Sequence, residues 1–225
     1  DTVLNGGSFY VLSGGSATGT IVNSGHGYIS GVDENAVVNG GIQEIRSGGK
    51  TLGTTVSGGR IQVDSGATAE NTTVSGEGSM RVAGSASGTT VKDDASLTLT
   101  GYGWVENTVL LDGTMDVNDD TLSENTTISG GIQYVYGTDS KSTLNGGTQN
   151  IENGGVSKNT TINNGMQNIG QGGRASDTEL NSGTQTVSSG GVADETSIAA
   201  GAVQNVSGRA SATTIQSGGV QNVLS

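Results

Sequence analysis

The stretch NTTINNGMQNIGQGGRAS runs from Asn159 to Ser176, and the residues that follow it, Asp177–Asp194, read DTELNSGTQTVSSGGVAD. Both segments place Thr, an aliphatic residue, Gln, Val or Ile, a Gly-Gly pair and Ala at the same offsets. No cluster of charged side chains is kept in place between them. The two segments are therefore copies of one structural unit rather than of one catalytic motif.

The unit recurs along the whole chain. Its second residue, usually Thr, is found at Thr2, Thr20, Ala36, Thr54, Thr72, Thr89, Thr108, Thr126, Ser142, Thr160, Thr178, Thr196 and Thr214. The steps are mostly 18 residues long and range from 16 to 19. A short repeat of nearly constant length is typical of a solenoid, in which each unit stacks on the next.

The composition indicates which kind of solenoid this is. The chain has 41 Gly, no Pro, no Cys and 3% aromatic residues, and Gly, Thr, Val and Asn suit short strands joined by tight turns. Helical repeats need about 30 residues or more. We therefore predict an all-β, parallel β-helix with one coil per ~18 residues and about 12 coils, which makes a rod of roughly 60 Å.

A single repeat domain is expected over residues 1–225, as a fragment of a longer protein, with irregular coils at about 77–140. In that stretch the steps vary and the Gln slot becomes apolar.

Alternation along the strands predicts which side chains point inward, because residues two positions apart share a face. The fourth slot of the unit is aliphatic in every repeat except the last, where Gln216 interrupts it. The Thr of the second slot then also points inward. The third slot points outward and holds Thr55, Thr73, Thr90, Thr127 and Thr161.

A second inward slot carries Gln. It holds Gln43, Gln133, Gln149, Gln167, Gln185, Gln204 and Gln221, and in other repeats Phe9, Ile61, Met80, Leu97 and Met115. Large apolar residues replace Gln only where the side chain is buried. Buried amides must be hydrogen-bonded, and stacked Gln side chains achieve this by bonding to each other. We therefore predict a structural glutamine ladder, with the Gly-Gly pair forming a tight corner.

The unit N-T-T-[V/I]-x-x-G-x-Q-x-[V/I]-x-x-G-G-x-A, clearest over Asn125–Ser225 and Asp1–Glu70, resembles the passenger repeat of self-associating bacterial autotransporters. These include the AIDA-type adhesin, the TibA adhesin/invasin and antigen 43. The resemblance implies a right-handed parallel β-helix that forms the passenger, is secreted across the outer membrane and is displayed on the cell surface. It implies host-cell adhesion, autoaggregation and biofilm formation, with itself on neighbouring cells and the host-cell surface as partners.

The resemblance also implies O-heptosylation of Ser or Thr by an autotransporter heptosyltransferase. The outward Thr55, Thr73, Thr90, Thr127 and Thr161 are the acceptor candidates, with plain solvent-facing strand residues as the alternative interpretation.

Charge excludes several classes of partner. With 9 Lys and Arg against 21 Asp and Glu, the net charge is −12. Nucleic acids and anionic membranes require basic patches, so neither is an expected partner. No stretch is apolar and long enough to span a membrane, and direct membrane insertion is not expected.

No enzyme, cofactor or metal site is predicted, because no convergent set of functional groups is visible. His26, the only His, is expected in an exposed turn. Acids gather within Glu77–Ser140, Asp139 among them, and the candidates for self-association there are Asp93, Asp94, Asp112, Asp119 and Asp120. Stacked carboxylates could instead bind Ca²⁺, or the stretch could form the cleft of a carbohydrate-active enzyme. A structural stalk that binds nothing is a third alternative.

Overall fold

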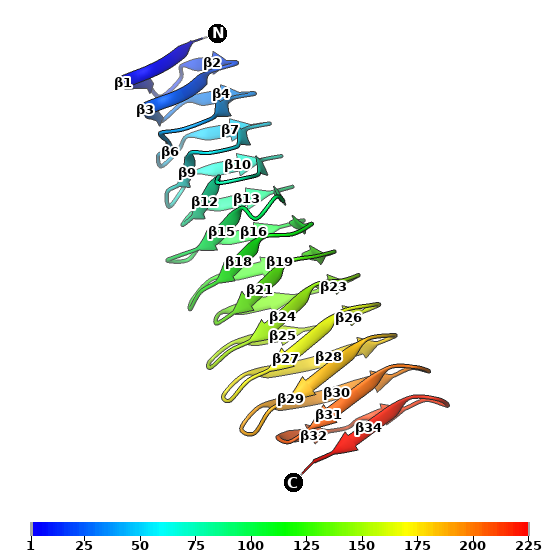
Figure 1. Cartoon of the computed structure of the whole chain (residues 1–225). Coiled ribbons are helices and arrows are strands. Elements are labelled where there is room, and N and C mark those ends of the chain that lie inside the picture. The colour runs from blue at the N-terminus through cyan, green and yellow to red at the C-terminus, as the bar shows by residue number, and fades with distance from the viewer. Residues whose placement is uncertain (1, 225) are drawn as a thin grey trace.

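A computed structural model describes residues 2–224, and the chain winds there into a rod of about 12 stacked coils (Figure 1). All strand pairs are parallel, and each strand pairs with its equivalent in the coils before and after it. The two ends of the chain lie at opposite ends of the rod. The predicted parallel β-helix is confirmed.

Each coil has three faces, which we call A, B and C in chain order. Face A consists of two-residue strands: β5 (Val37–Val38), β8 (Thr55–Val56), β11 (Thr73–Val74), β14 (Thr90–Val91), β17 (Val109–Leu110), β20 (Thr127–Ile128), β23 (Thr143–Leu144), β26 (Thr161–Ile162) and β33 (Thr214–Ile215). In the first two coils, β1 (Val3–Val11) and β3 (Ile21–Ile29) cover faces A and B without a break.

Face B consists of four-residue strands: β6 (Ile42–Ile45), β9 (Arg60–Val63), β12 (Ser79–Val82), β15 (Ser96–Leu99), β18 (Thr114–Val117), β21 (Ile132–Val135), β24 (Thr148–Ile151), β27 (Met166–Ile169), β29 (Thr184–Val187), β31 (Val203–Val206) and β34 (Val220–Val223).

Face C consists of three-residue strands: β2 (Ser16–Thr18), β4 (Val32–Glu34), β7 (Lys50–Leu52), β10 (Thr68–Glu70), β13 (Ser85–Ser87), β16 (Trp104–Glu106), β19 (Leu122–Glu124), β22 (Thr138–Ser140), β25 (Val156–Lys158) and β32 (Arg209–Ser211). Two longer strands, β28 (Arg174–Leu180) and β30 (Val192–Ile198), join face C to face A.

The predicted alternation holds on face A. The Thr slot and the aliphatic slot are both buried, as at Thr126 and Ile128, and the residue between them faces outward. The predicted register of the last repeat is wrong, because Ile215 pairs with Ile198 and Thr214 pairs with Ser197. Thr213, one residue earlier than expected, therefore occupies the second slot of this repeat. Gln216 lies beyond the strand and does not interrupt the aliphatic column.

A single residue forms the corner between face C and face A, and it adopts the left-handed conformation in every coil. Its φ lies between 52° and 65° at Gly19, Asn35, Gly53, Asn71, Gly88, Asn107, Asn125, Lys141, Asn159, Asp177, Glu195 and Ala212. Gly adopts this conformation without strain, and Asn and Asp tolerate it better than other residues. This requirement explains the Asn that precedes Thr-Thr in the repeat.

The Gly-Gly pair forms the corner between face B and face C, as at Gly154-Gly155. The first Gly has a positive φ of 87°. The second has a different role, because a Cβ atom on Gly155 would lie 2.0 Å from the carbonyl oxygen of Val135 in the preceding coil. The corner therefore needs one Gly for its backbone conformation and the other for close coil stacking.

The inward Gln side chains of six successive coils form a hydrogen-bonded chain, which we call the glutamine ladder. Each Nε2 donates to the Oε1 of the Gln in the preceding coil, over 2.5 to 2.8 Å, from Gln221 through Gln204, Gln185, Gln167 and Gln149 to Gln133. All donors thus point towards the N-terminus of the rod. Hydrogen bonds aligned in this way polarise and strengthen one another.

The first amide of the glutamine ladder, Gln133, needs an acceptor of another kind. Asp139, which is fully buried, accepts from Gln133 Nε2 at 3.1 Å, from Gln149 Nε2 at 2.8 Å and from the Ser142 hydroxyl at 2.8 Å. Burial raises the pKa of Asp139 above its ordinary value, and these hydrogen bonds offset that rise only in part. The expectation that placed Asp139 among surface acids is therefore wrong.

Gln43 is buried but lies outside the glutamine ladder, which corrects its assignment there. Its neighbours across the sheet are Gly27 and Ile61, which have no amide side chain. Its Nε2 instead donates to the carboxylate of Asp33 at 2.8 Å. The Nε2 group of a lone inward Gln thus donates to a buried Asp, as that of the first Gln of the ladder does, whereas the buried Gln43 Oε1 has no hydrogen-bond partner.

Within residues 2–224, no helix has the length and hydropathy that a membrane span requires.

Candidate functional surface

The five candidate acceptor threonines lie in one column on the outside of face A. Thr55, Thr73 and Thr90 are neighbours in successive coils. Thr127 and Thr161 flank Thr143, which the sequence analysis missed because Ser stands before it instead of Thr. Of the five candidates only Thr55 is exposed, and the others are half-buried. Val109 interrupts the column between Thr90 and Thr127, and the coils on either side limit access to most of its hydroxyls.

More accessible hydroxyls lie at the corners of the coils. Exposed serines occur there at Ser47, Ser57, Ser65, Ser129, Ser182, Ser188, Ser189 and Ser207. Sequence reasoning overlooked them because it concentrated on the strand residue next to the Asn turn. The recurring Ser before Gly was the signal that could have found them.

The five acidic candidates do not form one edge. Asp93, Asp94 and Asp112 lie at the corner between faces A and B, where the backbone N–H of Asp94 donates to Asp112 Oδ1 at 3.2 Å. Asp119 and Asp120 lie at the corner between faces B and C. The structure therefore places the five acids at two separate corners, three residues at the first and two at the second.

His26 is not a turn residue, which is a further correction. It lies within β3, where its ring stacks on Tyr28 with 4.1 Å between centroids, and its Nε2 lies 3.2 Å from Glu44 Oε2. Arg46 covers the Tyr28 ring at 4.1 Å and pairs with Glu44 at 2.7 Å. This cluster ties the first coils together through side chains that satisfy one another.

The corner between faces A and B carries hydrogen-bonded Asn side chains. Asn23 donates to Asn5 at 2.8 Å and Asn39 donates to Asn23 at 2.9 Å. A second series joins Asn181, Asn163 and Asn145 over 3.1 and 2.9 Å. These bonds hold exposed amides in fixed positions along the rod, which makes this edge a preorganised polar surface.

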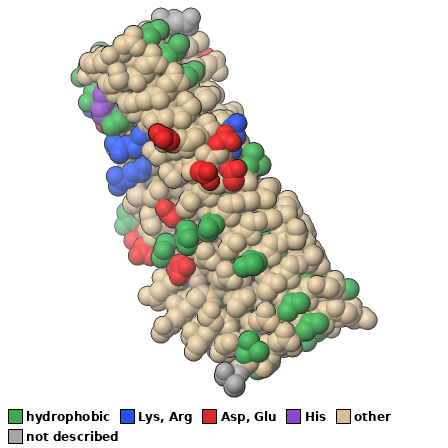
Figure 2. Space-filling view, viewed as in Figure 1, with side chains coloured by type: hydrophobic (Ala, Val, Ile, Leu, Met, Phe, Trp, Pro, Cys, Tyr) green, Lys and Arg blue, Asp and Glu red, His purple; other side chains and the backbone are tan. Residues whose placement is uncertain are grey.

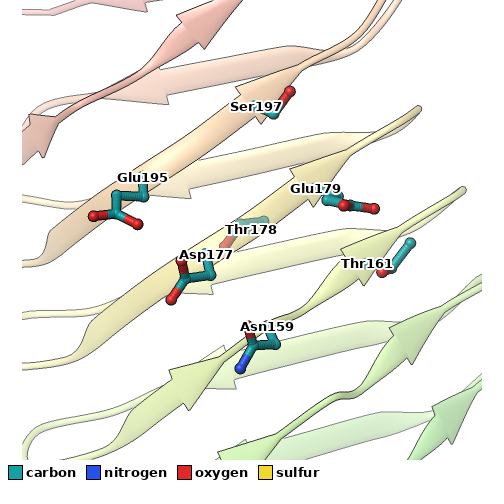
Figure 3. Close-up of a pocket in the computed structure, with 7 residues that line it drawn as sticks. All are labelled: Asn159, Thr161, Asp177, Thr178, Glu179, Glu195 and Ser197. Carbon is teal, nitrogen blue, oxygen red and sulfur yellow. The ribbon is translucent and has the colours of Figure 1, made fainter.

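An open polar groove of about 490 Å³ runs along face A near the C-terminal end of the rod (Figure 3). One side is formed by the corner residues Asn159, Asp177 and Glu195, and the other by the outward column that includes Thr161, Glu179 and Ser197. The pKa of Glu195 is raised, first of all by its hydrogen bond with the Asp177 carboxyl group and by the negative charge there.

The lining of this groove limits its chemistry. Its residues carry carboxyl, hydroxyl and amide groups but no Lys, Arg or His. Among residues 2–224, no group of three or more His, Asp or Glu is placed to hold a metal ion. The groove can accept hydrogen bonds from a polar partner.

Three shallow hollows lie along the corner between faces B and C. The first is lined by Tyr102 and Trp104, and Tyr136 contributes to both others, together with Asp119. On the side shown in Figure 2, hydrophobic and acidic side chains are interspersed at mid-length, and uncharged polar surface dominates towards the C-terminus. The irregular coils thus have a different surface from the regular ones.

Comparison with solved structures gives a match over the full length of the chain. No family model and no curated protein matches the sequence. Among solved structures, the chain is similar to a hyper-glycosylated TibA fragment whose modification was catalysed by TibC, with a TM-score of 0.79 and 27% sequence identity. The match covers 100% of this chain and 96% of that one. The resemblance to a TibA-like passenger, expected from the repeat, is confirmed.

Proposed function

Because the chain is similar over its whole length to the TibA fragment, we propose that it is a passenger region of an autotransporter adhesin, displayed on the bacterial surface. The observation that supports this most strongly is the full-length match at 27% identity. The uninterrupted stack of coils agrees with it, since a solenoid offers a long surface to partners. Host-cell adhesion, autoaggregation and biofilm formation are the functions we assign to that surface.

We further propose that the rod is O-heptosylated by a dedicated glycosyltransferase. The similar TibA fragment is hyper-glycosylated, and this chain has exposed hydroxyls at its corners and at Thr55. Access decides between acceptors, because a transferase must reach the hydroxyl. We therefore expect the corner serines and Thr55 to be modified before the half-buried Thr73, Thr90, Thr127 and Thr161.

The test is the intact mass of the protein made with and without a co-expressed autotransporter heptosyltransferase, followed by peptide mapping. Additions in steps of one heptose on corner serines and Thr55 are expected. The variant Thr55→Val should lose one acceptor, and Thr126→Val, at a fully buried position, should lose none. An unchanged mass in the presence of the active transferase would contradict the proposal.

Self-association is proposed to run along a polar edge of the rod, with the exposed carboxylates as hydrogen-bond acceptors for a facing rod. The two acidic corners can be tested separately. One variant replaces Asp93, Asp94 and Asp112 by Asn, and the other replaces Asp119 and Asp120 by Asn. Settling of cells that display each variant is compared with settling of cells that display the unchanged chain. The acidic edge is rejected if both variants settle like the parent.

A further inference from the structure

The few aromatic side chains fall into two groups, with Phe9, Tyr10 and Tyr28 in the first two coils and four others in the irregular coils. The protein has one Trp, five Tyr and one Phe, and Tyr102, Trp104, Tyr134 and Tyr136 all lie in the irregular coils. None of the four is buried, and Tyr102 is 85% exposed. The interior of these coils is filled by Met80, Leu97, Met115 and their neighbours, so the fold does not require the aromatic residues.

These residues line consecutive hollows at the corner between faces B and C. The hollow beside Tyr102 and Trp104 has a volume of about 360 Å³, and the two that share Tyr136 have volumes of about 420 and 590 Å³. Tyr102 and Tyr136 lie at the same corner two coils apart, and Asp119 and Asp120 occupy the coil between them. At ~4.8 Å per coil, the two Tyr positions are roughly 10 Å apart along the axis.

The side chains indicate the chemical class of the ligand. Aromatic rings pack against flat apolar surfaces, and carboxylates accept hydrogen bonds from hydroxyl groups. A pyranose ring has both features, with C–H groups on its faces and hydroxyls around its edge. The lining of the three hollows contains no Lys, Arg or His, so a sulfated or carboxylated sugar would meet only like charge.

The dimensions agree with this class. A sugar unit in a chain is roughly as long as one coil is high, ~5 Å, so two units fit between the two Tyr positions. We propose that the corner between faces B and C, from Ser65 to Gly154, binds a neutral oligosaccharide. Tyr102, Trp104 and Tyr136 stack on its rings, and the carboxylates between them accept its hydroxyl hydrogen bonds. This inference rests on the proposed adhesin function and supplies a ligand class for it.

The only Trp of the chain lies in this site, so its fluorescence reports binding directly. The whole chain is titrated with neutral hexasaccharides of glucose, mannose, galactose and N-acetylglucosamine. Saturable binding to at least one of them is expected. Tyr102→Ala or Tyr136→Ala should weaken it about tenfold through loss of a stacking contact, and Tyr102→Phe should leave it within about twofold. Tyr10→Ala, at an exposed Tyr in the first coil, is the control that should bind like the parent.

Several outcomes would overturn the inference. They are the absence of saturable binding to all four sugars, binding that Tyr102→Ala does not weaken, and a preference for anionic sugars. If the Trp104 fluorescence changes with protein concentration but not with added sugar, the corner binds a second copy of the chain instead. Experiments on cells that display the chain on their surface test the adhesin function separately from sugar binding. Clumping that persists when no sugar binds leaves the adhesin function standing, whereas sugar binding without adhesion or clumping contradicts that function alone.

Discussion

The direction of the glutamine ladder makes a quantitative prediction for the variant Gln167→Met. Met80 and Met115 occupy this slot fully buried in other coils, so the replacement fits the space. It removes the only acceptor of the Gln185 Nε2 group, which is now bonded to Gln167 Oε1 at 2.7 Å. On the other side, Gln149 Oε1 keeps the hydroxyl of Ser157 as a donor at 3.2 Å.

The variant therefore leaves one buried donor unsatisfied, and such a group destabilises a protein by about 1–3 kcal/mol. Gln185→Met disrupts more of the glutamine ladder, because it removes the acceptor of Gln204 Nε2 and of the Thr196 hydroxyl, and also the donor to Gln167 Oε1. The double variant lacks both groups of the Gln167–Gln185 bond and orphans only Gln204 Nε2 and the Thr196 hydroxyl. We expect about 2 kcal/mol for Gln167→Met, more for Gln185→Met, and a double variant that costs at least about 2 kcal/mol less than the sum of the two single changes.

The local free energy of opening is measured by amide hydrogen exchange in β27 and β29, since solenoids do not always unfold in two states. Gln221→Met serves as a matched control. Gln221 lies in the last coil and is half-buried, and its own amide is the donor to Gln204. Its loss orphans no donor within residues 2–224 and leaves only an acceptor, Gln204 Oε1, without its partner, so it should cost less than Gln167→Met. Additive single effects, or a terminal change as costly as Gln167→Met, would refute the reasoning.

Three further predictions concern the corners and the buried acid. Lys141→Asn should raise the free energy of unfolding by about 1 kcal/mol, because Asn tolerates the left-handed φ of 58° at this corner better than Lys; urea denaturation measures the change. Gly155→Ala should lower the free energy of unfolding by about 2 kcal/mol, since its Cβ would collide with a backbone carbonyl of the preceding coil, and an unchanged urea midpoint would contradict this. The pKa of Asp139 is raised from its ordinary value of 3.8, first by burial. Its contribution to stability is therefore present below that value and lost as the pH rises through the folded pKa. Asp139→Ser, which introduces the residue found at this position in both neighbouring coils (Ser123 and Ser157), should remove that part of the pH dependence. The denaturation midpoint of the parent should then rise relative to that of Asp139→Ser as the pH falls from about 7 to 3, and parallel curves would contradict the prediction.

Much of the fold could be predicted from the repeat. The period of mostly 18 residues, the inward Thr and aliphatic columns and the inward Gln are confirmed by burial and strand pairing. These properties are local, because the direction of a side chain in a strand depends only on whether its position is odd or even. The one slip, at Thr214, arose because two adjacent Thr residues are equivalent in sequence and only pairing with the preceding coil identifies the correct one.

The candidate site was less predictable. The sequence placed Asp93 and Asp119 in one acidic stretch, yet the structure puts them at different corners. It could not show that Tyr102 and Tyr136 lie two coils apart along the same corner, since the loops there contain different numbers of residues. Proximity between coils depends on the summed lengths of all intervening strands and loops, and a shift of one residue changes which side chains meet.

By itself, then, the amino-acid sequence determined a β-solenoid with a polar amide column in its interior, because the repeat period and strand parity are written in each unit. Only the tertiary structure decided that Asp139 begins the glutamine ladder, that Gln43 stands apart from it, and that the amides all donate in one direction. The physical reason is that a buried polar group is satisfied by whichever partner the neighbouring coil supplies. That partner depends on the stacking of the coils and cannot be read from a single repeat.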